Sequence, residues 1–161
     1  MQFSTKRPRA IAVLATGCIV GVLDGAAAVA NAWFRSGTPP DRVFKYIASA
    51  IFGSAAFSGG AEMVATGIFL HFLVAIIWTM IFTVAYPAFP LARRNKWLVG
   101  CGYGLLVWLI MNRVVVPLTQ APPLKFSWEG AAMGWLIHML LVGIPIVWLV
   151  RRWYAVTVKF P

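Results

Sequence analysis

The stretch that decides the fold is MVATGIFLHFLVAIIWTMIFTVAY, residues 63–86, which contains no Asp, Glu, Lys or Arg. A helix that crosses the hydrocarbon core of a bilayer needs about 20 such residues. Three further segments are similarly apolar: Ala10–Phe34, with Asp24 as its one charged residue, Trp97–Val116, with Arg113 as its one charged residue, and Gly130–Val150, with none. An open sheet would leave its peptide groups without partners in lipid, so these segments are predicted to be helices. The sequence therefore predicts an all-α, four-helix integral membrane bundle.

The composition agrees with a membrane protein. Of the 161 residues, 61% are hydrophobic and 11% are charged, whereas a soluble domain carries about 25% charged residues. The net charge is +10, but the basic residues cluster at the ends of the apolar runs. Such clusters face anionic lipid headgroups, so we expect membrane lipids as partners and no nucleic acid. One transmembrane domain spanning residues 1–161 is predicted.

The distribution of Lys and Arg predicts the orientation of the helices. Nine of them lie in the N-terminal segment, the loop between the second and third helices, and the C-terminal tail: Lys6, Arg7, Arg9, Arg93, Arg94, Lys96, Arg151, Arg152 and Lys159. Five lie on the opposite side: Arg35, Arg42, Lys45, Arg113 and Lys125. The more basic side of a membrane protein faces the cytoplasm. Both termini are therefore predicted to be cytoplasmic.

The first outer loop contains signals for a short helix at residues 39–52. Thr38 is a predicted N-cap, Pro39 suits the first helical position, and Asp41 favours the positive end of the helix dipole. Apolar residues then recur at helical spacing: Phe44, Ile47, Ile51 and Phe52. This pattern indicates an amphipathic helix that either anchors on the outer membrane interface or forms a lid, for which Gly53, Gly59 and Gly60 would supply the hinge.

Small residues recur four apart on every predicted membrane helix. Examples are Gly17, Gly21 and Gly25 on the first helix, and Gly100 and Gly104 on the third. In lipid, helices associate through the close approach that small residues allow. The pattern predicts a tightly packed bundle of the GxxxG type and carries no information about function.

The polar residues inside the predicted helices form the candidate site. They are Asp24, Asn31, His71, Asn112, Arg113 and His138. His71 and His138 are predicted to lie at a common depth near the midplane, and most other polar groups fall in the outer halves of the helices. The asymmetry predicts a polar cavity that opens outward.

Three interpretations of these residues stay open. They form hydrogen bonds that hold the helices together. They line a pathway for a solute, a lipid headgroup or protons, because ionisable groups within membranes often mark one. Or His71 and His138 bind a metal or a b-type haem, since helix bundles build cofactor sites from facing helices. A c-type haem is excluded because the sequence has no CxxCH motif. No catalytic motif is present, which favours a non-enzymatic protein.

The second half of the chain resembles a known family. The residues that carry the resemblance are His71 in a helix that ends at Tyr86-Pro87, Phe89-Pro90, Trp97-Leu98-Val99-Gly100, Val116-Pro117-Leu118, Pro122-Pro123, and Gly134 with His138. In this order they resemble the YagU-like, DUF1440-type group of bacterial inner-membrane proteins. The resemblance covers roughly the last 90 residues and implies a bacterial inner-membrane location without a particular chemistry.

Taken together, the sequence predicts a small multi-pass inner-membrane protein that is either an accessory subunit or transporter-like. As a subunit it would belong to a membrane-protein complex. Four helices are few for a transporter, so a homo-oligomer is expected if the protein transports a solute. The rival hypothesis is an electron-transfer or metal-binding protein that uses His71 and His138.

Overall fold

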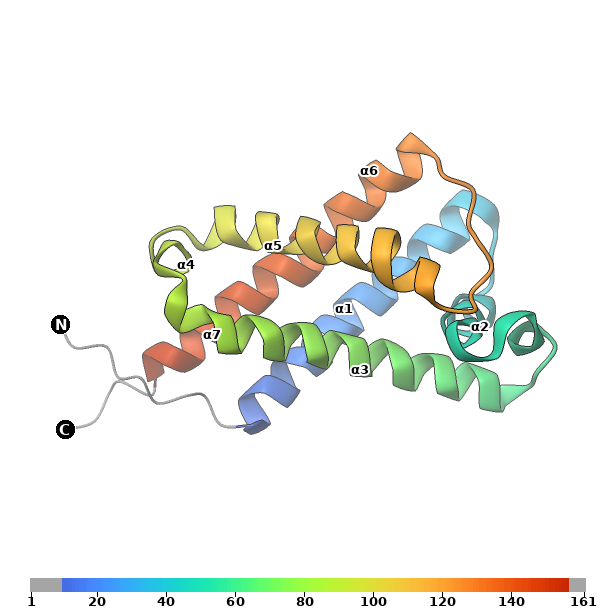
Figure 1. Cartoon of the computed structure of the whole chain (residues 1–161), viewed down its shortest axis with the longest axis horizontal. Coiled ribbons are helices and arrows are strands. Elements are labelled where there is room, and N and C mark those ends of the chain that lie inside the picture. Colours follow the sequence, from blue (N-terminus) through green and yellow to red (C-terminus); the bar gives the residue numbers. More distant parts are fainter. Residues whose placement is uncertain (1–9, 157–161) are drawn as a thin grey trace.

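Four long apolar helices make up the fold, as the sequence predicts (Figure 1). The computed structural model of the chain describes residues 10–156. Each of its four helical spans is long and apolar enough to cross a membrane: Ala10–Ser36, Ala61–Ala88, Lys96–Leu118 and Trp128–Ala155. No strand occurs among residues 10–156. The chain is thus an all-α membrane bundle, and each span is slightly longer than the segment expected from the sequence.

Shorter helical segments connect or interrupt the four spans. In chain order the elements are α1 (Ala10–Ser36), α2 (Pro40–Phe52), η1 (Gly53–Phe57), α3 (Ala61–Ala85), η2 (Tyr86–Ala88), α4 (Pro90–Arg94), α5 (Lys96–Ile110), η3 (Met111–Val115), η4 (Val116–Leu118), α6 (Trp128–Ile137), η5 (His138–Gly143) and α7 (Ile144–Val156). Proline marks several boundaries, because it lacks an N–H and suits the first turn of a helix. η3 and η5 are π-helical turns inside the third and fourth spans.

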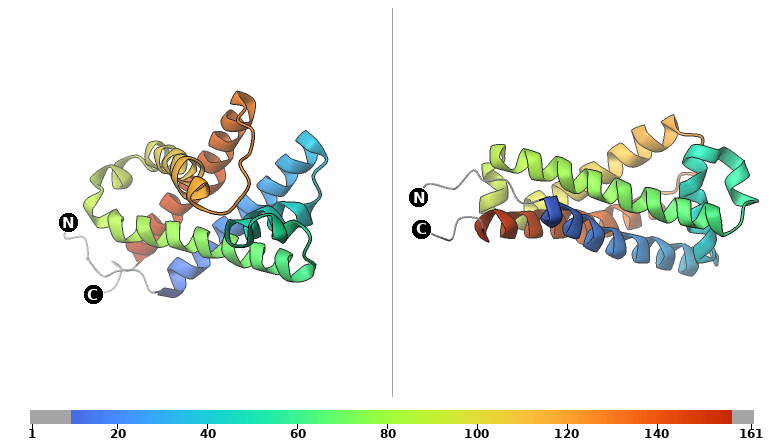
Figure 2. Two further views of the ribbon diagram at one scale, coloured as in Figure 1. Left: turned by 45° about the vertical axis from the view of Figure 1, so that its right-hand side comes forward. Right: turned by 90° about the horizontal axis from the view of Figure 1, so that it is seen from below.

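The two ends of the bundle differ in charge. α1 begins and α7 ends at the same end, where α4 turns the chain from α3 into α5 (Figures 1 and 2). The basic residues at this end are Arg93, Arg94, Lys96, Arg151 and Arg152, and we call it the basic end. Lys6, Arg7, Arg9 and Lys159, which also entered the predicted orientation, lie outside the described residues.

α2 covers the opposite end, which we call the capped end. In Figure 1 this helix is seen almost end-on, so it lies across the direction of the membrane helices. It packs so closely on α3 that a side chain at Gly67 would overlap the carbonyl of Phe44. The backbone N–H of Gln120 donates to the carbonyl of Ala50 at 3.1 Å. α2 therefore docks on α3 and on residues 119–127, which join η4 to α6 and form the predicted second outer loop.

The start of α2 differs from the prediction in one respect. Its N-cap is Pro39, with no side-chain hydrogen bond. Thr38, predicted as the cap, instead places its hydroxyl 2.7 Å from that of Ser36. A second proline at Pro40 moves the first helical position one residue along, so Thr38 is too far back to cap the N–H groups of the first turn. α2 ends as expected at Gly53, whose φ of 58° lies in the left-handed region that favours glycine.

Glycines bring the membrane helices into backbone contact. A Cβ added at Gly17 would lie 2.6 Å from the Ile76 side chain, and one at Gly21 would lie 2.6 Å from the Phe72 ring. These positions set the contact between α1 and α3. A Cβ added at Gly104 of α5 would overlap the backbone of His138 in η5. The bundle is therefore held by close helix approach, which is how association proceeds in lipid.

Aromatic residues fill the core near the basic end. The rings of Tyr86 and Tyr154 stack with centroids 4.7 Å apart. The Tyr154 hydroxyl donates to the carbonyl of Thr83 at 2.9 Å, and the Tyr103 hydroxyl donates to the carbonyl of Trp78 at 2.6 Å. The sequence predicts most polar groups in the outer halves of the helices, so these hydrogen bonds near the basic end were not expected. The hydroxyls of Tyr103 and Tyr154 each donate to a helix carbonyl, so their polar atoms are satisfied without water.

Two glycines of α5 offer a matched test of the packing. Gly104→Ala should lower the free energy of unfolding by about 1–3 kcal/mol, because the new methyl group would press on backbone that cannot rotate away. Gly102→Ala should leave stability unchanged or raise it by up to about 1 kcal/mol through helix propensity, because nothing lies within 4 Å of its added Cβ. Unfolding in mixed micelles titrated with dodecyl sulfate measures both. Equal stability of the two variants would contradict the α5–η5 contact described here.

Candidate functional site

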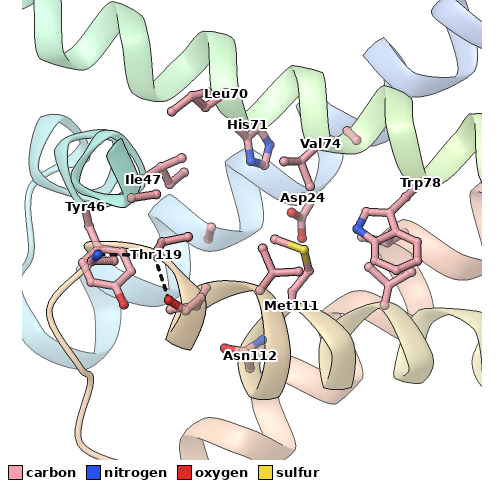
Figure 3. Close-up of a pocket in the computed structure, with 18 of the residues that line it drawn as sticks. Asp24, Tyr46, Ile47, Leu70, His71, Val74, Trp78, Met111, Asn112 and Thr119 are labelled. Atoms are coloured by element: carbon pink, nitrogen blue, oxygen red, sulfur yellow. Dashed lines mark hydrogen bonds between the residues drawn. The ribbon is translucent and has the colours of Figure 1, made fainter. Parts of the chain in front are cut away.

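A cavity of about 420 Å³ lies between the membrane helices in the half of the bundle nearer the capped end. Its lining comes from α1, α2, α3, the third span, the second outer loop and η5, while α6 contributes no residue. The lining residues are Val20, Asp24, Ala28, Tyr46, Ile47, Ala50, Ile51, Leu70, His71, Val74, Ala75, Trp78, Val107, Met111, Asn112, Val115, Val116, Thr119, Ala121, His138 and Val142. Figure 3 shows most of these side chains around the cavity.

The cavity is mainly apolar. Its polar lining residues are Asp24, Tyr46, His71, Asn112, Thr119 and His138, and apolar side chains make up the remainder. This differs from the polar cavity expected from the sequence. The reason is that each polar lining residue except Thr119 is a single position on a helix whose other lining residues are mostly apolar, such as Val20 and Ala28 beside Asp24. An apolar cavity with a few placed polar groups is typical of a small-molecule site.

The structure brings together four of the six candidate residues from the sequence, namely Asp24, His71, Asn112 and His138. It separates the other two. Asn31 is half-buried on α1 and lies outside the cavity lining. The Arg113 guanidinium is exposed and lies over the Phe126 ring, 4.9 Å from its centroid. Arg113 therefore forms no ion pair with Asp24.

Asp24 is the one charged residue in the lining. It is half-buried on α1, and Figure 3 shows it among the side chains of α3 and η3. Within residues 10–156 its carboxylate has no hydrogen-bond donor and no ion-pair partner. The ion pairs that the described residues form, Arg35–Glu129 at 3.7 Å and Lys45–Asp41 at 3.6 Å, lie in α1's last turn, α2 and the start of α6. The carboxylate is therefore available to whatever occupies the cavity.

His71 links α3 to α1. Its Nε2 lies 2.8 Å from the carbonyl oxygen of Gly21. Because a carbonyl can only accept, Nε2 carries the proton and donates, and in the neutral ring Nδ1 keeps its lone pair. The ring is held edge-on by Phe44, at 6.4 Å between centroids, and by Phe72 at 5.7 Å. Aromatic contacts and the hydrogen bond fix the orientation of this imidazole.

His138 and Asn112 lie in the two π-helical turns. The Nδ1 of His138 donates to the carbonyl of Gly134 at 2.9 Å, which leaves Nε2 as the free nitrogen of the neutral ring. The Nδ2 of Asn112 donates to the carbonyl of Trp108 at 2.9 Å. Both bonds run back along the residue's own helix. π-helical turns are frequent at functional sites, and periodicity alone did not reveal them in this sequence.

Tyr46 and Thr119 also line the cavity, and sequence reasoning missed both. The Tyr46 hydroxyl donates to the carbonyl of Pro122 at 3.3 Å, and burial raises the pKa of this phenol, so it stays a neutral donor. The Thr119 hydroxyl donates to the carbonyl of Val116 at 2.7 Å and accepts from the N–H of Ala121 at 3.2 Å. The signal for Tyr46 was its place between Phe44 and Ile47 on the amphipathic helix. Thr119 follows a Pro-Leu turn and gave no signal of its own.

The two histidines fit a haem or metal site poorly. The Nε2 of His71 already donates to Gly21, so ligation through that nitrogen would require the ring to lose its bond to α1. The nitrogens that form no hydrogen bond are the Nδ1 of His71 and the Nε2 of His138. Within residues 10–156 no group of three His, Cys, Asp or Glu side chains is placed to hold a metal ion. Hydrogen bonding between helices accounts for the position of His71 without a cofactor.

No family model, curated protein or solved structure compared with the chain matches it.

Two alanines of α1 test whether the cavity holds water. Ala28 lines the cavity, whereas Ala26 is exposed on the outer surface of the bundle. In a chain with Cys18 and Cys101 replaced by alanine, Ala28→Cys should react with a small water-soluble thiol reagent. Ala26→Cys should react at least about ten-fold more slowly, because the reactive thiolate forms in water and not in lipid. Mass spectrometry of membranes after timed labelling gives both rates, and an unreactive Ala28→Cys would mean that the cavity is dry.

Proposed function

We propose that this protein is a non-enzymatic, transporter-like membrane protein whose cavity binds a small, mostly apolar molecule that carries one positive charge. The observation that carries the proposal is the Asp24 carboxylate, which lines an otherwise apolar cavity and has no partner within residues 10–156.

Size and lining favour a small organic ligand. Pockets for such ligands range from about 300 to 1,000 Å³ and are mostly apolar, and the cavity measures about 420 Å³. Trp78, Leu70 and Ile47 offer apolar surface from two different elements. A hydrated inorganic ion would gain nothing from these side chains. The ligand is therefore an organic molecule with an apolar body.

The negative charge of Asp24 favours a cationic ligand. An ionised side chain within a bilayer costs about 2.5–3.5 kcal/mol even on insertion scales, so Asp24 needs water or a counter-charge. No Lys or Arg lines the cavity. A ligand ammonium or other organic cation would supply the missing charge, while an anion would be repelled. His71 and His138 each use one ring nitrogen in a hydrogen bond to a backbone carbonyl, which leaves the other nitrogen of each ring for a ligand.

α2 is suited to serve as the lid of this cavity. It supplies Tyr46, Ile47, Ala50 and Ile51 to the lining. Hydrogen bonds to the second outer loop, from Tyr46 to Pro122 and from Gln120 to Ala50, hold it closed. Gly53 ends the helix in a conformation that glycine adopts without strain, which makes this position a hinge. Opening α2 would expose the cavity at the capped end.

We further propose that the membrane is the bacterial inner membrane, with the basic end in the cytoplasm. The support is the distribution of Lys and Arg along the sequence, with nine in the N-terminal segment, the loop between the second and third membrane helices and the C-terminal tail, and five in the remainder. The resemblance of the second half of the chain to YagU-like proteins adds to it. The cavity and its lid would then face outward. A solute would enter from outside, and the spans would have to rearrange, alone or in a homo-oligomer, for it to leave on the other side.

Two isosteric ions test the binding proposal. Tetraphenylphosphonium and tetraphenylborate have nearly the same shape and opposite charge. Detergent-solubilised protein should bind the cation and not the anion in equilibrium dialysis. Asp24→Asn should weaken binding of the cation by about thirty-fold or more, since loss of one partner of a desolvated charge pair costs at least about 2 kcal/mol.

Asp41→Asn is the matched control, because it removes the same charge from an exposed position on α2 that lies outside the cavity lining. Its affinity for the cation should equal that of the wild type. An equal loss of affinity for the cation in both variants would mean that the net charge of the protein, and not the cavity, determines binding. Equal binding of the two ions by the wild type would overturn the proposal.

A further inference from the structure

A second depression of about 470 Å³ lies on the outside of the bundle, between α1, α5 and α7 toward the basic end. Its floor is formed by Ile144, Pro145 and Leu149 of α7, all half-buried. One wall is Ile19 and Leu23 of α1, which are 48% and 37% exposed. The other wall is Trp97 of α5, which is 60% exposed. We call this depression the basic-end groove.

The groove has a cationic rim at one end only. Lys96, which begins α5, lines the groove, and its Nζ lies 5.0 Å from the centroid of the Trp97 ring. Trp148 also lines the groove, and the Arg152 guanidinium lies over its ring at 5.9 Å. Tryptophan with an adjacent basic residue is characteristic of the level of the lipid headgroups. The rim therefore lies where a phosphate would be, and the apolar walls lie where an acyl chain would be.

No carboxylate opposes these cations. Among residues 10–156 the acids are Asp24, which lines the central cavity, and Asp41, Glu62 and Glu129, which lie toward the capped end. The basic end has five Lys and Arg residues and no acid in this part of the chain. A zwitterionic headgroup would bring a second positive charge close to Lys96, whereas an anionic one would not. Charge complementarity thus selects an anionic headgroup.

The groove is shorter than one leaflet. It extends from Ile144 to Leu149 on α7 and from Ile19 to Leu23 on α1, which is about 6–8 Å along each helix at 1.5 Å per residue. One leaflet of the hydrocarbon core is about 15 Å thick. Part of an acyl chain of a lipid in the leaflet at the basic end would therefore lie within the groove. We propose that the basic-end groove binds one anionic phospholipid, with its phosphate beside Lys96 and an acyl chain against Ile144, Pro145 and Leu149.

Native mass spectrometry of the whole protein tests this proposal. The protein is released from micelles that contain equal amounts of phosphatidylglycerol and phosphatidylcholine with identical acyl chains. The wild type should retain phosphatidylglycerol in preference. Lys96→Gln should reduce its retention by about five-fold, the factor expected for one basic residue at the membrane surface. Lys125→Gln, which removes the same charge from an exposed loop at the capped end, should change nothing.

Leu149→Trp tests the contact with the acyl chain separately from the contact with the headgroup. It fills the floor of the groove and keeps every charge, so retention of phosphatidylglycerol should fall although Lys96 is intact. Added glycerol phosphate, which has no acyl chain, should fail to displace the lipid. Equal retention of the two lipids by the wild type, or unchanged retention in Lys96→Gln, would overturn the proposal. A dimer of the chain that Leu149→Trp dissociates would assign the groove to a second copy instead.

Discussion

Lipid offers no hydrogen bonds, and this constraint explains both the packing of the bundle and the unpaired charge of Asp24 in the lining of the cavity. In a membrane helix the N–H groups are used within the helix, while each carbonyl oxygen can accept a second bond. A side chain that donates can therefore find a partner on a neighbouring helix, as His71 does at Gly21 and Tyr154 does at Thr83. A carboxylate only accepts, so the same backbone offers it nothing. Asp24 is left facing the cavity for this reason, and its partner has to come from outside the bundle.

The same constraint decides how much of the structure the sequence predicts. A long apolar run in lipid can only form a helix, because a helix satisfies its own peptide groups. The four spans and their order therefore follow from composition and length. Depth along each helix then places Asp24, His71 and His138 near one level, and all three line the cavity. Asn31 and Arg113 show the limit of this reasoning, because periodicity gives a direction only relative to a helix axis. Which neighbouring helix a side chain contacts depends on the rotation and tilt of both helices, and the sequence pattern does not contain this information.

The features that the sequence did not predict depend on contacts distant in the chain. α2 is positioned by Gly67, which admits its backbone, and by the bond from Gln120. The π-helical turns η3 and η5 interrupt spans whose hydrophobic pattern reads as continuous helix. At η5 the turn begins where Gly104 allows α5 to press on the backbone of His138. Tertiary contacts, and not local preference, therefore set the cap of the cavity and the direction of two of its polar side chains.

Under the proposed function, binding and closure of the lid are coupled by geometry. A ligand shifts a conformational equilibrium only as far as its contacts differ between the two states. α2 supplies Tyr46, Ile47, Ala50 and Ile51 to the lining, so a bound molecule contacts these side chains only when the lid is closed. The carboxylate of Asp24 is on α1 and faces the cavity whether the lid is open or closed. The charge of a ligand would then determine its binding, and its apolar body would determine closure. A small inorganic cation would pair with Asp24 but would not contact the apolar side chains of α2, so it would not favour closure of the lid. The apolar lining therefore matters as much as the charge.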